Sequence, residues 1–324
     1  MLHLRLITPA DRTKAVISAI ESTVGTTHLV VLPGTALEPP GDVVLCDVAR
    51  EAGDELLNEL RGLGIEEDGS IAVENIDLSL SRRADAAEEE APGEAADAVL
   101  WEQLTEATHE ESTLTITYVA FMILATMIAA CGVVLDNAIL IVGAMAVGPE
   151  FGPLAGVCTG VVQRRPRLAL RSLGALLTGF ALAIFATTVF SLGMDAIGQF
   201  HAQMLEQPRP NTGFIWRPDP LSFVVSLLAG MAGVLSLTSA KSGALVGVAI
   251  SVTTVPAGAN AAVALSYGDF AQMWGSAEQL LINLCGIMLA GVLTLYGQKA
   301  LWRTQRGRWS RGPKTPKTPK TPKA

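Results

Sequence analysis

The chain has 324 residues, of which 50% are hydrophobic, only 17% are charged and 5% are aromatic. A soluble globular domain carries about 25% charged residues, so this composition excludes an ordinary soluble protein. The formal net charge of −8 is unevenly distributed along the chain. Residues 1–111 hold 24 of the 31 acidic residues, whereas the charged residues of 299–324 are all Lys or Arg. These changes divide the chain into an acidic head, an apolar body and a basic tail.

The head alternates between strand-like and helix-like segments. Alternating apolar residues predict strands over 3–7, 28–32, 42–48 and 70–80. Apolar residues at helical spacing predict one helix between the first two strands and a second over 50–62. This β-α-β-β-α-β order is that of the ferredoxin-like arrangement, so we expect a small α+β ferredoxin-like domain over 1–80. The first residues lack the pattern of a secretory signal, which favours a cytosolic head.

Three further segments flank the body. Residues 81–97 are rich in Ala, Glu and Asp, which is typical of a solvated acidic linker. Residues 98–112 predict an amphipathic elbow helix whose Trp101 suits the membrane interface. The Pro-Lys-Thr repeats of residues 301–324 predict a basic disordered tail that contacts anionic lipid.

The body, residues 113–300, contains six apolar runs of the length that crosses a bilayer core, which is about 20 residues. The six predicted spans are 114–135, 138–162, 168–193, 220–239, 243–265 and 278–299. The one strongly basic loop, 163–167, and the basic tail both fall in the cytosol when the N-terminus is cytosolic, as the positive-inside rule requires. We therefore expect a multi-pass α-helical protein of the cell inner (plasma) membrane with both termini in the cytoplasm.

The second run is interrupted by polar and helix-breaking residues. Pro149 and Pro153 each remove a backbone donor, and Glu150 between them is the only acid deep inside a predicted span. Glu150 either binds a proton, cation or substrate amine, or is a protonated carboxyl bonded to a freed carbonyl. Glycines follow at every fourth position and predict a face for close helix packing. They are Gly148, Gly152, Gly156 and Gly160.

The fifth run has a matching interruption. Pro256 and Gly258 are expected to break it, and Thr253, Thr254 and Asn260 make it unusually polar. The broken helix is second of three in each half, and the two halves cross the membrane in opposite directions. This placement predicts a 3+3 inverted repeat with a binding site where the broken helices meet.

Two segments also resemble a known family. Gly143-Ala-Met-Ala-Val-Gly-Pro-Glu-Phe-Gly-Pro-Leu and Gly247-Val-Ala-Ile-Ser-Val-Thr-Thr-Val-Pro are similar to the two hallmark segments of the domain of unknown function 389 family. The resemblance covers about residues 115–265 and implies a bacterial or archaeal integral membrane protein without an assigned activity. Typical members carry small or apolar residues at the positions of Glu150 and Phe151, so the resemblance assigns no role to Glu150.

These features predict a transporter of a small solute or ion. Its binding site is expected to contain Gly148, Pro149, Glu150, Pro153, Thr253, Thr254, Pro256 and Asn260, with Gly152, Gly156 and Gly160 in helix packing. The alternatives are a homo-oligomeric channel and a membrane sensor or assembly platform regulated by the head. The expected partners are the lipid bilayer, the solute and further copies of the chain, with no nucleic acid.

Enzymatic and cofactor chemistry are not expected. All four histidines lie outside the predicted spans, so hydroxyl groups in the bundle lack a base. The cysteines are scattered, with neither metal-ligand nor disulfide spacing, and are predicted to be buried thiols. They are Cys46, Cys131, Cys158 and Cys285.

Overall fold

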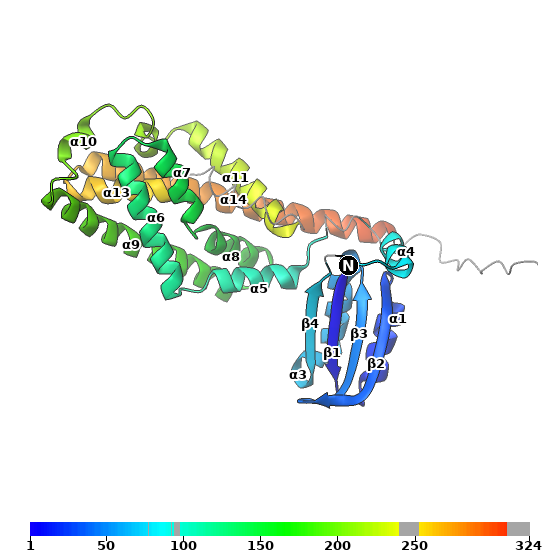
Figure 1. Ribbon diagram of the computed structural model, residues 1–324. Coiled ribbons are helices and arrows are strands. Elements are labelled where there is room, and N and C mark those ends of the chain that lie inside the picture. The colour runs from blue at the N-terminus through cyan, green and yellow to red at the C-terminus, as the bar shows by residue number, and fades with distance from the viewer. Residues whose placement is uncertain (77, 92, 94–97, 240–252, 310–324) are drawn as a thin grey trace, which may run out of the picture. The chain divides into compact units, whose positions relative to one another are not determined.

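Figure 1 shows the computed structural model, which describes the chain except residues 77, 92, 94–97, 240–252 and 310–324, and only the backbone of 302–309. The chain divides into two compact units, one built on Met1–Val99 and one on Leu100–Tyr296. The first unit combines a sheet with helices, and the second unit is helical.

The first unit contains a four-stranded antiparallel sheet with the strand order β2-β3-β1-β4. Its elements are β1 (Leu2–Thr8), α1 (Thr13–Ser22), β2 (Thr26–Leu37), β3 (Pro40–Val48), α2 (Arg50–Gly62), α3 (Ile65–Asp68), β4 (Ser70–Asn75) and α4 (Arg82–Glu90). Alternate residues of β1, namely Leu2, Leu4 and Leu6, are buried in the core, as a sheet with one covered face requires. The predicted order of strands and helices is confirmed, with α3 as an addition.

Two predicted boundaries of the head are wrong. The last strand was expected to reach residue 80, but β4 ends at Asn75, because its only neighbour, β1, begins at Leu2 and leaves nothing further to pair with. Residues 82–90 were expected in a solvated linker, but they form α4. Ser81 caps this helix by accepting a hydrogen bond from the Ala84 amide at 3.4 Å.

The second unit is a helical bundle. Its elements are α5 (Trp101–Glu111), α6 (Ile116–Val134), α7 (Ala138–Val147), α8 (Phe151–Val162), α9 (Pro166–Ala196), α10 (Ala202–Glu206), η2 (Gly213–Trp216), α11 (Pro220–Thr238), α13 (Thr254–Ser266) and α14 (Phe270–Trp309). Among the described residues, α6, α9, α11 and α14 are each long and apolar enough to cross a membrane. The pair α7 and α8 is bent by 51° and makes a fifth candidate span. The chain is therefore a multi-pass membrane protein.

The predicted break in the second span is confirmed. Residues 148–150 separate α7 from α8, so Pro149 lies in the break itself and Pro153 lies in the first turn of α8. A proline in the first turn removes a donor that has no partner inside the helix in any case, so α8 tolerates it.

The last two predicted spans need correction. The fifth was predicted over 243–265, and its first ten residues lie outside the described part of the chain. The remainder begins as α13 at Thr254, so Pro256 sits in the first turn and Gly258 does not interrupt the helix. With 13 residues, α13 is about 20 Å long, too short to cross a bilayer core of about 30 Å.

The sixth span starts eight residues earlier than predicted and ends ten residues later. It was predicted over 278–299, but α14 runs from Phe270 to Trp309. The helix starts early because the Asp269 carboxylate accepts a hydrogen bond from the Gln272 amide at 3.0 Å and caps the first turn. Residues 301–309 are therefore helical and not part of a disordered tail, whereas 310–324 lie outside the described residues.

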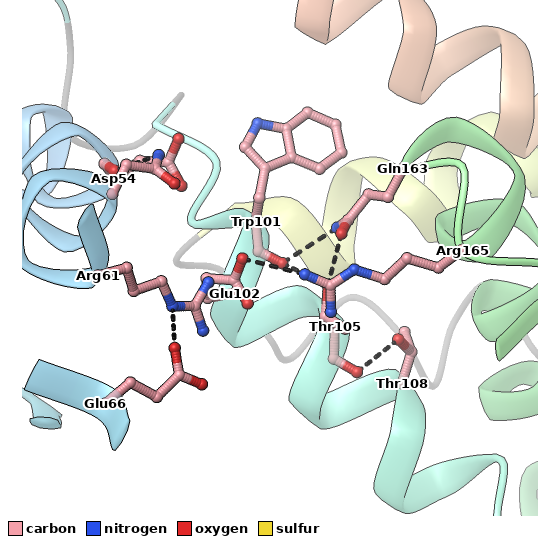
Figure 2. Close-up of polar contacts among 10 residues, drawn as sticks. Asp54, Arg61, Glu66, Trp101, Glu102, Thr105, Thr108, Gln163 and Arg165 are labelled. Carbon is pink, nitrogen blue, oxygen red and sulfur yellow. Dashed lines mark hydrogen bonds and ion pairs between the residues drawn. The ribbon is translucent and has the colours of Figure 1, made fainter. Parts of the chain in front are cut away.

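Close packing joins α8 to its neighbours. Two hydrogen bonds join the C-terminal end of α8 to α5. Gln163 donates to the Trp101 carbonyl at 3.2 Å and accepts from the Thr105 hydroxyl at 3.0 Å (Figure 2). Along α9, a methyl group added to Gly160 would lie 2.6 Å from the backbone nitrogen of Ala169. At this position the two backbones approach too closely for a side chain.

This packing predicts a difference between two glycines of the bent pair. A Gly160→Ala substitution should destabilise the protein by about 1–3 kcal/mol, because the methyl group meets backbone that cannot rotate away. Gly143→Ala in α7 is the matched control, since nothing lies within 4 Å of the added group. Thermal unfolding in detergent measures both, and an equal midpoint for the two variants would contradict the close approach.

Candidate functional site

Helices α8 and α13, called here the facing helices, lie along the same side of the long helix α9. Gly156 and Gly160 of α8 pack against Ser172 and Ala169, so α8 runs antiparallel to α9. A methyl group added to Gly258 of α13 would lie 3.4 Å from the ring of Phe180. The carbonyl of Ala262, one turn further along, accepts from Thr188 at 3.2 Å.

It follows that α13 runs parallel to α9 and that the two facing helices begin next to each other. Their first turns meet between the levels of Ser172 and Phe180, about 15 Å along α9 from its start at Pro166. The meeting point of the two helix N-termini therefore lies inside the bundle, within the length of the candidate span α9.

Neither facing helix has a side-chain cap. Glu150 precedes α8 and Thr253 precedes α13, and neither side chain bonds to the first turn. Of the other helices in this unit, α6, α7 and α11 begin with caps from Thr115, Asn137 and Asp219, whereas α5, α9 and α10 also lack a side-chain cap. The uncapped starts leave backbone N–H groups and the positive ends of two helix dipoles at one point inside the bundle.

Glu150 lies at this meeting point. Its side chain is only 3% exposed, and the hydroxyl of Thr254, the first residue of α13, donates to one carboxyl oxygen at 2.7 Å. The other carboxyl oxygen has no hydrogen-bond partner among the described residues. A buried carboxyl group with an unused oxygen is costly unless it carries a proton or receives a ligand.

A row of buried polar residues on α14 leads away from this point. The row, called here the polar line, consists of Gln272, Ser276, Gln279 and Asn283, spaced four, three and four residues apart on one helix face. Asn283 donates to the Thr253 hydroxyl at 3.2 Å, at the start of α13. At the far end, Arg209 donates to Gln272.

The polar line has a length that suits half a membrane. Eleven residues separate Gln272 from Asn283, which corresponds to about 16 Å of helix. The line thus covers the distance from the α10–η2 side of the bundle to the meeting point of the facing helices. Such a row of buried amide and hydroxyl groups is expensive in a bundle that lipid surrounds, and it usually marks a path for polar ligands.

The structure brings together some of the residues that the sequence predicted for the site and separates others. Glu150, Thr253 and Thr254 meet, with Gly148 and Pro149 in the adjoining break and Pro153 and Pro256 each in the first turn of a facing helix. Asn260 lies apart from them, about 9 Å further along α13. There it donates to Ser276 at 2.7 Å and accepts from Arg209 at 2.9 Å.

The glycines predicted to pack lie on the other side of α8. Gly152 faces Glu111, and Gly156 faces the hydroxyls of Ser112 and Ser172. They position α8 and do not line the meeting point.

Sequence reasoning missed Arg209 and the polar line. Arg209 was assigned to a loop outside the membrane, and Gln272 and Ser276 preceded the predicted sixth span. The pattern that indicates the polar line is four polar residues on one helical face within an apolar run. The predicted sixth span begins at residue 278, eight residues after α14 starts, and therefore excludes Gln272 and Ser276.

Comparison with known families gives a match over part of the chain. Residues 145–289 match the family model described as a domain of unknown function, DUF389. The chain carries a DUF389 domain. This domain extends from α7 into α14 and contains both facing helices, Arg209 and the whole polar line.

One relative extends the similarity beyond the domain. An uncharacterized protein of Methanocaldococcus jannaschii is 24% identical over 225 residues, which cover 68% of this chain and 68% of the relative. No solved structure matches the chain. The DUF389 match thus supports a membrane protein and leaves the activity to be inferred from the site.

The contact between Glu150 and Thr254 yields a testable prediction. A Thr254→Val substitution removes the hydroxyl that donates to Glu150 and should cost about 1–3 kcal/mol, because the buried carboxyl then loses its side-chain donor. Thr254→Ser keeps the hydroxyl and should stay close to the wild type. The thermal unfolding midpoints of both variants in detergent provide the measurement, and a loss in Thr254→Ser as large as that in Thr254→Val would contradict the stabilising role of the hydrogen bond.

Proposed function

We propose that the DUF389 chain is a transporter that moves a small polar solute or ion through the meeting point of the facing helices. The observation that carries this proposal is the Glu150 carboxyl group, which is buried between two helix N-termini without side-chain caps and has one oxygen that no described residue bonds to. Discontinuous helices that end at mid-membrane are the usual site of solute and ion binding in secondary transporters. A structural glutamate in a tightly packed bundle would be expected to use both oxygens.

The polar line supports translocation over simple binding. It supplies hydrogen-bonding groups across about half of the membrane core, so a solute can exchange water for amides and hydroxyls on its way to Glu150. A site that only held a structural proton would need no such row of amides. The proposal is therefore transport and not catalysis.

A wider architecture belongs to the same proposal. Six spans in a 3+3 inverted repeat would relate α8 to α13, and both helices indeed start with an uncapped residue followed three positions later by proline. The basic loop near Arg165 and the C-terminal tail would lie in the cytoplasm of a cell with an inner membrane. The head would be a ferredoxin-like domain, and the chain would form homo-oligomers.

A flux assay tests the proposal. Proteoliposomes that contain the wild type are screened with a panel of small inorganic ions and organic solutes, and active solutes are retested with Glu150→Gln. We expect flux to fall by about tenfold or more, since a loss of about 1.4 kcal/mol of binding energy is tenfold in affinity. Glu106→Gln is the control, because Glu106 is exposed on α5 and should leave flux unchanged.

The outcomes separate the candidate mechanisms. Saturable flux that depends on Glu150 supports a carrier, whereas unitary currents would identify the channel alternative. Equal flux through Glu150→Gln and wild type would remove Glu150 from the pathway. No flux of any solute through a folded, correctly inserted protein would contradict the transport proposal.

A further inference from the structure

Arg209 is a buried cation at the outer end of the polar line. Its side chain is 8% exposed and points from the segment between α10 and η2 into the bundle. It donates to the side-chain amide oxygen of Asn260 at 2.9 Å and to the side-chain amide oxygen of Gln272. Both partners are neutral amides, so they solvate the charge without cancelling it.

No carboxylate balances this charge at close range. Within the described part of the chain, no acidic oxygen lies within 4.0 Å of the Arg209 guanidinium, and the undescribed segment 240–252 contains no Asp or Glu. Burial lowers the pKa of Arg209, which Asp136 and Asp269 raise from a greater distance. Both acids are engaged elsewhere, since Asp136 accepts from Asn211 and Thr212 and Asp269 caps α14.

Glu150 is too far away to serve as the counter-charge. Thr254, which bonds to Glu150, and Asn260, which bonds to Arg209, are about 9 Å apart along α13. At about 9 Å two unit charges attract by about 2 kcal/mol with an effective dielectric constant of about 20, against about 4 kcal/mol at 4 Å. A guanidinium has five N–H donors, and within the described part of the chain two of them bond to side-chain amide oxygens.

We propose that Arg209, with Asn260 and Gln272, binds a small anion, which makes the transported solute an anion of the carboxylate or inorganic oxyanion class. A planar guanidinium fits two oxygens of such an anion side by side. The assignment to transport rests on the proposed function, whereas the binding site itself does not.

The alternative role for Arg209 is a structural pin that holds the α10–η2 segment on the bundle. The carboxylate of Asp136 already anchors this segment, through the Asn211 side chain at 3.0 Å and the Thr212 hydroxyl at 2.9 Å. A pin would affect folding stability without any response to anions. Anion response therefore distinguishes the two roles.

The test measures anion binding to purified full-length protein in detergent without added lipid. The protein is kept in sodium chloride, whose anion has no oxygen atoms, and titrated at constant ionic strength with sodium nitrate, bicarbonate, acetate, sulfate or phosphate, while the thermal unfolding midpoint is followed. At least one anion should raise the midpoint saturably, because a ligand that binds the folded state stabilises it.

Three variants show whether Arg209 is responsible. Arg209→Gln should weaken anion binding by about tenfold or more, whereas Arg217→Gln, an exposed arginine of the same loop, should change it by less than about twofold. Asn260→Asp places a carboxylate 2.9 Å from the guanidinium nitrogen Nη1. This internal counter-charge should abolish the anion response while the protein stays folded, so the test remains decisive even if Arg209→Gln does not fold.

Several results would overturn the inference. They are the lack of any midpoint shift in the wild type, an unchanged anion response in Arg209→Gln or Asn260→Asp, and a shift that only added phosphatidylglycerol produces. The last result would assign the site to a lipid headgroup. A protein that binds these anions but moves no solute would lose the transport proposal and keep the site, whereas flux of a cation without anion binding would remove this inference alone.

Discussion

A backbone N–H group inside hydrocarbon has no water to bond to, so each one must find a partner within the bundle. The break at residues 148–150 and the start of α13 at Thr254 place the first turns of two helices without a side-chain cap at one point. Pro153 and Pro256 each remove one backbone donor from these turns. The positive ends of the two helix dipoles meet there, and Glu150 occupies this place in the structure.

The polar line and Arg209 give this centre a connection to one face of the bundle. Gln279 bonds to Asn283 within the row, and the ends of the row bond to Thr253 and, through Arg209, to Asn260. Among the described residues, one oxygen of Glu150 and the side-chain oxygen of Gln279 have no hydrogen-bond partner, and Arg209 contacts no carboxylate within 4.0 Å. A bound anion would supply the charge that pairs with Arg209.

The sequence was sufficient to predict the apolar spans, because hydrophobic length is read directly from the residues: α6, α9 and α11 begin and end within three residues of their predicted bounds. It also predicted the break at Pro149 and the polar starts of both facing helices. It could not show that Asn260 is separated from Glu150, because helix direction and pairing are tertiary properties. It misplaced the start of α14, since Gln272 and Ser276 resemble loop residues until their common helical face is recognised.

The meeting of the two facing helices is the central claim, and disulfide cross-linking in native membranes tests it most directly. A Cβ atom added to Gly148 would lie 2.8 Å from Cγ2 of Val255, so side chains at the two positions are in direct contact, as a disulfide requires. In a background without the four native cysteines, Gly148→Cys and Val255→Cys should cross-link on mild oxidation, whereas Gly143→Cys with Val255→Cys should not. A folded protein in which the first pair stays reduced would contradict the account.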